Sequence, residues 1–249
     1  MRLKQFINEG RRSKEISFDE AVKIASKHCK KAISSSTPIY RGINDNNIYQ
    51  YSFIDPKKYT RRSVETQNIY TYIIDNSPAW KEYPKRSKSI ICTTKRTEAT
   101  TYGFIYLVFP FDGSKIGVSP EADIWYAFKE INKKDGSLLS FNDRIMMIFD
   151  ELGLTFYDGT YEKFLNSMKI LQDNIHRSKL VRFSVLQNYK SGDIIKFIED
   201  ILDPKKNGFQ LKTIGDALPF DKEVWTDGKS VIVHEDNVDN FIETVKNNL

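Results

Sequence analysis

Apolar residues recur at helical spacing over Phe18–Ile33, which predicts an amphipathic helix near the start of the chain. The segment Ser17–Glu20 predicts its beginning, since a serine oxygen can accept a bond from the first turn and a glutamate follows three residues later. Similar periodicity over about 123–203 predicts three or four consecutive helices. Further helices are predicted over Val64–Asn76, Thr97–Tyr102 and Asp236–Leu249.

Shorter apolar segments, rich in β-branched and aromatic residues, predict strands between these helices. The predicted strands are Pro38–Ile43, Ser89–Thr93, Phe104–Phe109, Ile116–Val118, Glu223–Thr226 and Ser230–Val233. Because Asp227-Gly228 is typical of hairpin turns, the last two strands are expected to pair with each other. The whole pattern predicts an α+β fold: one domain with an N-terminal helix and a helical insertion.

Composition excludes several classes of protein. The chain has 249 residues, of which 16 are Phe and 13 are Tyr, so enough apolar surface is available to offset chain entropy. The longest apolar runs, such as Gly103–Phe111, are far shorter than the roughly 20 residues of a membrane span, and no membrane partner is predicted. The net charge of +5 is too mild to predict nucleic-acid binding by itself. No metal site is predicted, because His28 has only Cys29 near it at ligand spacing.

Three short segments carry candidate chemistry. They are Ile39–Gly42, with an arginine near a strand end, Ile91–Thr94, with two hydroxyls, and Asp221–Trp225, with two carboxylates. Asp221 and Glu223 are two positions apart, so on an extended segment both would face one site. Each segment alone has an ordinary explanation, such as a surface ion pair or a solvated acidic face.

Taken in order, the segments resemble the Arg–Ser–Glu class of mono-ADP-ribosyltransferases, whose motifs run aromatic-Arg-Gly/Ser, Ser-Thr-Ser and Glu-x-Glu-Val/Ile. The resemblance implies a split β-sheet core and an enzyme that transfers ADP-ribose from NAD⁺, its substrate. This chain departs from the pattern at Cys92, in place of the first serine, and at Asp221, in place of the usual Glu or Gln.

The resemblance also implies roles for individual residues. Those implied to hold NAD⁺ are Arg41, Gly42, Thr93 and Thr94. An arginine suits the diphosphate because it stays charged and can bind phosphate oxygens bidentately. Glu223 would bind the ribose 2′-OH and stabilise the positive charge that forms as nicotinamide leaves. Asp221 would face the incoming nucleophile. We expect Arg41 and Glu223 to approach one cleft, with Thr93 or Thr94 at its wall.

A basic stretch, Arg61–Lys88, contains interleaved aromatic residues. Two interpretations remain open: contact with a phosphate-rich ligand or nucleic acid, or a solvated basic loop. In the first, Arg62 or Lys85 would line the NAD⁺ cleft.

The first nine residues, Met1–Glu9, resemble the capsid-targeting peptide of internal head proteins of T4-like phages. In that family the prohead protease cuts after Glu in a Leu/Ile-x-Glu context, which Ile7-Asn8-Glu9 fits. The resemblance implies a mature domain of residues 10–249 that travels inside the virion and then enters the host cytoplasm. The ordinary alternative is a frayed amphipathic terminus.

The leading hypothesis is therefore a packaged, injected mono-ADP-ribosyltransferase that modifies a host protein or, as the second acceptor class, a nucleic acid. Its first alternative is an inactive transferase-like protein that binds and neutralises a host defence factor. Its second is a basic head protein that binds DNA, with affinity that falls steeply with salt.

Overall fold

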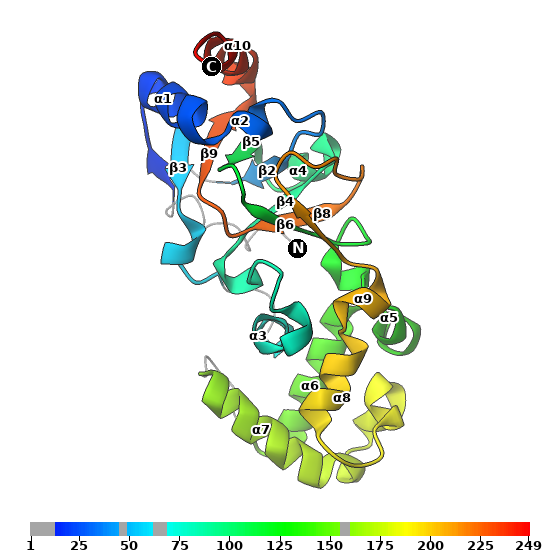
Figure 1. Ribbon diagram of the computed structural model, residues 1–249. Helices are drawn as coiled ribbons and strands as arrows, with labels where there is room; N and C mark the ends of the chain where they lie inside the picture. Colours follow the sequence, from blue (N-terminus) through cyan, green and yellow to red (C-terminus); the bar gives the residue numbers. More distant parts are fainter. Residues whose placement is uncertain (1–12, 45–48, 62–68, 155–159) are drawn as a thin grey trace. The chain divides into compact units, whose positions relative to one another are not determined.

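The computed structural model describes residues 13–44, 49–61, 69–154 and 160–249. The predicted leader Met1–Glu9 and Arg62 lie outside the described residues. The chain forms two compact units. The first comprises Met1–Arg61, Tyr83–Ala122 and Gln210–Leu249, and the second comprises Arg62–Glu82 and Asp123–Phe209 (Figure 1).

The first unit is built on an antiparallel sheet with the strand order β1-β3-β9-β5-β2-β4-β8-β6-β7. The strands are β1 (Lys14–Glu15), β2 (Tyr40–Ile43), β3 (Tyr51–Ile54), β4 (Ile90–Thr93), β5 (Phe104–Pro110), β6 (Lys115–Val118), β7 (Gln210–Thr213), β8 (Glu223–Thr226) and β9 (Ser230–His234). Its helices are α1 (Phe18–His28), α2 (Lys30–Ile33), α4 (Arg96–Thr100) and α10 (Val238–Asn247). The predicted α+β class is thus confirmed.

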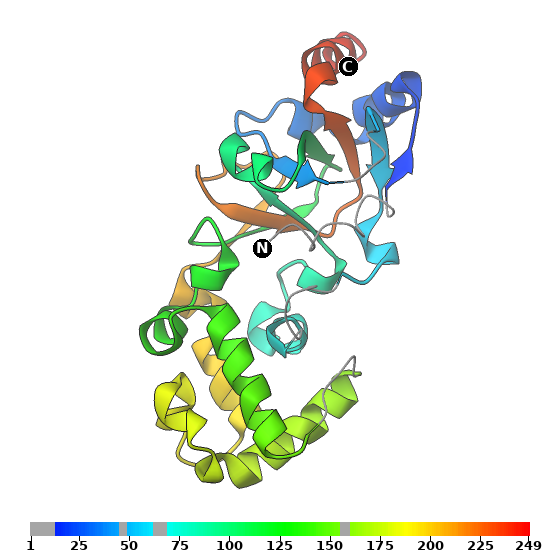
Figure 2. The same ribbon diagram turned by 180° about the vertical axis from the view of Figure 1, so that it is seen from behind.

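Helix α1 shows how local sequence produces this part of the fold. The Ser17 Oγ accepts the backbone N–H of Glu20 at 3.2 Å, so the predicted cap is present. The apolar face of α1 packs with α10 against the sheet, where Figure 2 also shows the two helices side by side. The buried residues of this core include Ala21, Ala25, Cys29, Val231, Val233, Phe241 and Val245.

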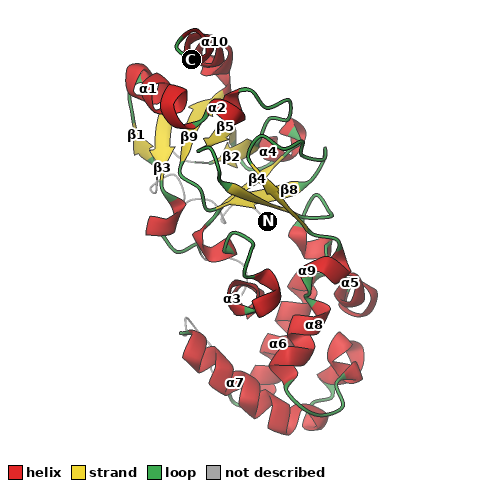
Figure 3. Ribbon diagram, in the orientation of Figure 1, coloured by secondary structure: helices red, strands yellow, loops and turns green. Residues whose placement is uncertain are grey.

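The second unit is helical in its described residues (Figure 3). Its α-helices are α3 (Ile69–Asn76), α5 (Lys129–Asp135), α6 (Leu138–Glu151), α7 (Tyr161–Asn174), α8 (Ile194–Ile201) and α9 (Pro204–Asn207). The predicted apolar stripes are buried, including Ile145 and Phe149 of α6 and Met168 of α7. The insertion predicted over about 123–203 lies within this unit, which extends to Phe209 and also takes up 62–82. None of the described helices is both long and apolar enough to cross a membrane.

The hairpin predicted around Asp227-Gly228 is wrong. Strand β8 pairs with β4 and β6, whereas β9 pairs with β3 and β5. Both strands are buried along their whole length and have a partner on each side. The turn therefore carries the chain between two parts of the sheet, because each strand gains more apolar burial in the interior than it would in an isolated ribbon.

Candidate functional site

The three segments singled out in the sequence occupy three adjacent strands. β2 carries Arg41, β4 carries Thr93, and β8 begins at Glu223. Tyr40 is paired with Thr93, and Thr93 is paired with Glu223, so one row crosses all three strands. Segments more than a hundred residues apart in the sequence are thus brought side by side by strand pairing within the first unit.

Arg41 is a buried cation at the centre of the sheet, with 4% of its surface exposed. Its Nη1 donates a hydrogen bond to the carbonyl of Ile91. Burial above all, and also the nearby positive charge of Arg61, lower the pKa of the guanidinium to about 10, so Arg41 stays charged at neutral pH. Both arginines line a cavity of about 30 Å³ with Ser87 and Ser89. That volume holds a water molecule or two rather than a dinucleotide.

Glu223 is held by an arginine that the sequence did not single out. The Nη1 of Arg86 lies 2.6 Å from the Oε1 of Glu223, in an ion pair whose side chains are 2% and 12% exposed. Arg86 also lies over the ring of Trp225, 5.0 Å from the ring centroid. In the sequence Arg86 was one basic residue among several in the stretch 61–88, and charge clustering was the only signal for it.

Arg41 and Glu223 do not lie in the same row of the sheet. Successive side chains of a strand alternate between faces, and Arg41 lies one position away from the row that contains Glu223. The register therefore departs from the expectation of a shared face. Burial raises the pKa of the Cys92 thiol to about 12, the charge of Arg41 lowers it, and the charge of Glu223 raises it. Both ions thus act on one buried thiol between them.

Thr94, the residue after β4, fastens the acidic loop to this strand. The Thr94 hydroxyl donates to the Pro219 carbonyl at 2.8 Å and accepts the backbone N–H of Lys222 at 3.0 Å. The Thr93 hydroxyl accepts the backbone N–H of Lys95 at 3.1 Å. Thr94 therefore positions the loop that leads into Glu223, which is a structural task distinct from the ribose contact that the resemblance implies.

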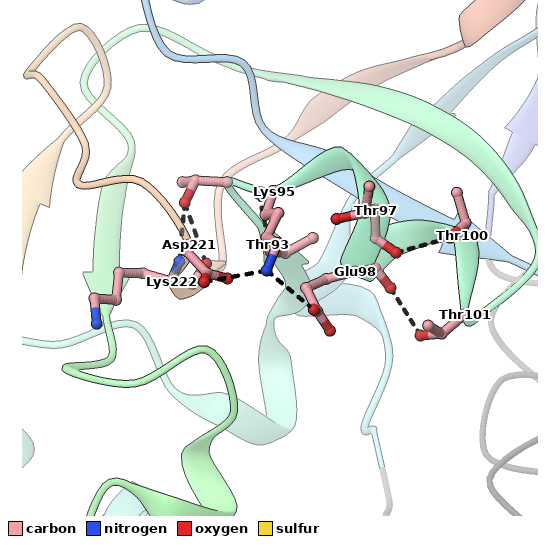
Figure 4. Close-up of polar contacts among 9 residues, drawn as sticks. Thr93, Lys95, Thr97, Glu98, Thr100, Thr101, Asp221 and Lys222 are labelled. Atoms are coloured by element: carbon pink, nitrogen blue, oxygen red, sulfur yellow. Dashed lines mark hydrogen bonds and ion pairs between the residues drawn. The ribbon is translucent and has the colours of Figure 1, made fainter.

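Asp221 does not share the extended conformation of Glu223. Its φ of 58° is left-handed, and β8 begins only at Glu223. The expectation that both carboxylates project to one face because they are two positions apart is wrong, since that spacing rule holds only for extended backbone. The Asp221 carboxylate pairs with Lys95 Nζ at 3.2 Å, and the same ammonium lies 3.5 Å from Glu98 (Figure 4).

Gly42 provides space that a larger residue would fill. A Cβ at this position would overlap the carbonyl oxygen of Ala99 and lie 2.7 Å from the Cβ of Tyr102. We expect Gly42→Ala to lower the free energy of unfolding by about 1–3 kcal/mol, as overpacking does. Urea unfolding measures this loss. Thr97→Ala, on the exposed side of α4, is the control and should stay within about 0.5 kcal/mol of the parent. Equal stabilities would show that β2 and α4 are not in tight contact.

No protein-family model, curated protein or solved structure matches the chain. Among the described residues, no three His, Cys, Asp or Glu side chains are grouped so that they could hold a metal ion. The site is therefore defined by its own geometry: buried Arg41, the Arg86–Glu223 ion pair, the Thr94 anchor and the Asp221–Lys95 pair.

Proposed function

We propose that the protein is an NAD-dependent mono-ADP-ribosyltransferase with an ADP-ribosyltransferase-like split β-sheet core. One observation carries the proposal: the three motif segments lie on adjacent strands β2, β4 and β8, in the order arginine, hydroxyl, glutamate. Two buried ions of opposite charge, Arg41 and Glu223, flank the middle strand. Burying an ion is costly unless it is paired, as Glu223 is with Arg86, and buried ionisable groups in such pairs occur at functional sites as well as in structural ones.

The residues present suit the chemistry of NAD⁺ cleavage. A guanidinium that stays charged, such as Arg41, can bind a diphosphate oxygen. The carboxylate of Glu223 would stabilise the cationic sugar that forms as the bond to nicotinamide breaks. Because the cavity beside Arg41 has room for water only, binding of NAD⁺ requires the surrounding segments to move apart.

The acceptor is proposed to be a host protein, with a nucleic acid as the second class. Phe220, 72% exposed, precedes Asp221 on the loop into β8, so an apolar ring and a carboxylate are presented together. An exposed aromatic of this size is typical of a contact surface for a macromolecule. The Asp221–Lys95 pair is about one-third exposed, and an incoming acceptor can therefore displace it at little cost.

Transfer is tested with NAD⁺ labelled on its adenylate half, incubated with the protein and a host lysate. The proposal expects a labelled macromolecule that protease removes if the acceptor is protein and nuclease removes if it is nucleic acid. Absence of any labelled product, with intact folded protein, would refute transferase activity.

A second candidate function has one observation in its favour. Glu223 is already bound to Arg86, so the chain fits an inactive transferase-like protein that binds and neutralises a host defence factor. The two candidates differ in the effect of Glu223→Gln. That substitution abolishes the action of an enzyme on its host, whereas a binding protein keeps its effect because its surface is unchanged.

We further propose that the protein is packaged in a phage head after the prohead protease cuts between Glu9 and Gly10, and that it then acts in the host cytoplasm. Residues 1–9 carry this proposal by sequence alone. Intact-mass measurement on protein from virions tests it. A mass that starts at Gly10 is expected, and a mass that retains Met1–Glu9 would end the processing hypothesis.

A further inference from the structure

We infer that Arg86 is a positioning residue for Glu223, one that fixes the direction in which its carboxylate meets the substrate. This inference rests on the proposed transferase function. It concerns the first unit alone, since Arg86, Glu223 and their neighbours all belong to that unit.

Arg86 is itself held on two sides. Its Nη1 is 2.6 Å from Glu223 Oε1, and its guanidinium stacks on Trp225. The indole in turn is anchored to the segment that carries Arg86, because Trp225 Nε1 donates to the Pro84 carbonyl at 2.8 Å. Tyr83, at the start of that segment, also stacks on Trp225, with ring centroids 6.3 Å apart. Arg86 is thus a fixed donor rather than a mobile surface side chain.

The strand geometry explains why one arginine can bind both groups. Glu223 and Trp225 are two positions apart in β8, so they project from the same face of an extended strand. Gly117, paired with Trp225 on β6, leaves the space that the indole fills, since a Cβ there would overlap the ring. The carboxylate and the ring therefore lie beside each other, and the guanidinium spans them.

A carboxylate held this way is restrained. The bond from Arg86 to Oε1 limits the orientations of the carboxylate, and therefore the direction in which it can meet a ribose hydroxyl. The negative charge of the carboxylate is what the developing sugar cation requires. The positive charge of the Arg86 guanidinium also repels the sugar cation, which slows the reaction. The gain from positioning is expected to exceed this cost, because misplacing a catalytic group by about 1 Å can cost on the order of 10²-fold in rate.

The experiment compares steady-state NAD⁺ cleavage by the wild-type protein, Arg86→Met and Arg86→Lys. For Arg86→Met we expect kcat to fall about 10²-fold while KM stays within about threefold, since the lost interaction orients rather than binds. Arg86→Lys should recover part of the loss, and added methylguanidine should raise the rate of Arg86→Met. The matched control is Lys88→Met, which removes a neighbouring positive charge that contacts Thr60.

Folding is checked separately, because removing Arg86 alone leaves a buried carboxylate without this partner. The double variant Arg86→Met/Glu223→Gln removes both charges. Thermal melting of Arg86→Met and of the double variant shows whether each protein is folded when its rate is measured. If folded Arg86→Met turns over as fast as the wild type or faster, the positioning role is overturned. If the wild-type protein itself releases no nicotinamide, the proposed function fails and this inference with it.

Discussion

If the protein cleaves NAD⁺ as proposed, Glu223→Gln is expected to lower the rate by about 10²–10³-fold, the loss typical when one electrostatic stabiliser of a transition state is removed. Glutamine keeps the shape of the side chain and an oxygen that can accept from Arg86, so the sheet stays folded. It loses the negative charge that the sugar cation needs. Alanine is a poorer test, because it also removes the partner of a buried guanidinium and is expected to cost stability.

The control for this variant is Glu235→Gln. Glu235 binds Arg96 in an exposed ion pair at 2.8 Å, so the same chemical change occurs in the same unit away from the proposed site. Nicotinamide release by Glu235→Gln should equal that of the wild type. If Glu223→Gln keeps wild-type activity in the same assay, the role assigned to Glu223 is refuted.

Asp135→Ala destabilises the helical unit by about 3–5 kcal/mol, the cost of breaking a buried ion pair from one side. The Asp135 side chain has no exposed surface, and its Oδ1 lies 2.9 Å from Nε of Arg144. Its Oδ2 accepts the backbone N–H of Val185 at 2.9 Å and lies 3.4 Å from the Ser184 hydroxyl. Burial raises the pKa of this carboxyl, and these partners act in the opposite direction, so each offsets part of the desolvation cost.

Urea unfolding followed by circular dichroism measures this effect. Asp200→Ala is the matched control: Asp200 belongs to the same unit and pairs with Lys206 on the surface, where about 0–1 kcal/mol is expected. A loss of less than about 1 kcal/mol for Asp135→Ala would show that the Asp135–Arg144 pair does not stabilise the unit.

Local signals in the sequence predicted the fold well, and pairing signals did not. The Ser17 cap and the helical stripes are set by neighbours within one or two turns, so periodicity sufficed to find α1, α6 and α7. The pairing of β8 with β4 depends on a segment more than a hundred residues away, and a turn dipeptide carries no information about it. The strands β1, β3 and β7 were not predicted; β1 has only two residues, and β7 has a single apolar residue among its four.

The candidate site was predicted only in part, because its geometry also depends on strand pairing and local backbone angles. From the resemblance we expected Arg41 and Glu223 to approach one cleft, with Thr93 or Thr94 at its wall; the strands of these residues are adjacent, but Arg41 lies one position off the row that contains Glu223. The direction of Asp221 depends on a left-handed backbone angle that spacing alone does not show. Arg86 became visible only when pairing brought Glu223 and Trp225 together, because a buried arginine and an exposed one look alike in a sequence.

Release of free nicotinamide measures directly whether this sheet cleaves NAD⁺, as we propose. Purified protein is incubated with NAD⁺ labelled in the nicotinamide ring, with and without host lysate, beside Glu223→Gln and Glu235→Gln at equal folded concentration. We expect the wild type and Glu235→Gln to release nicotinamide, with stimulation by the lysate, and Glu223→Gln to do so about 10²-fold or more slowly. Release from no sample, or equal release from all three proteins, would contradict it.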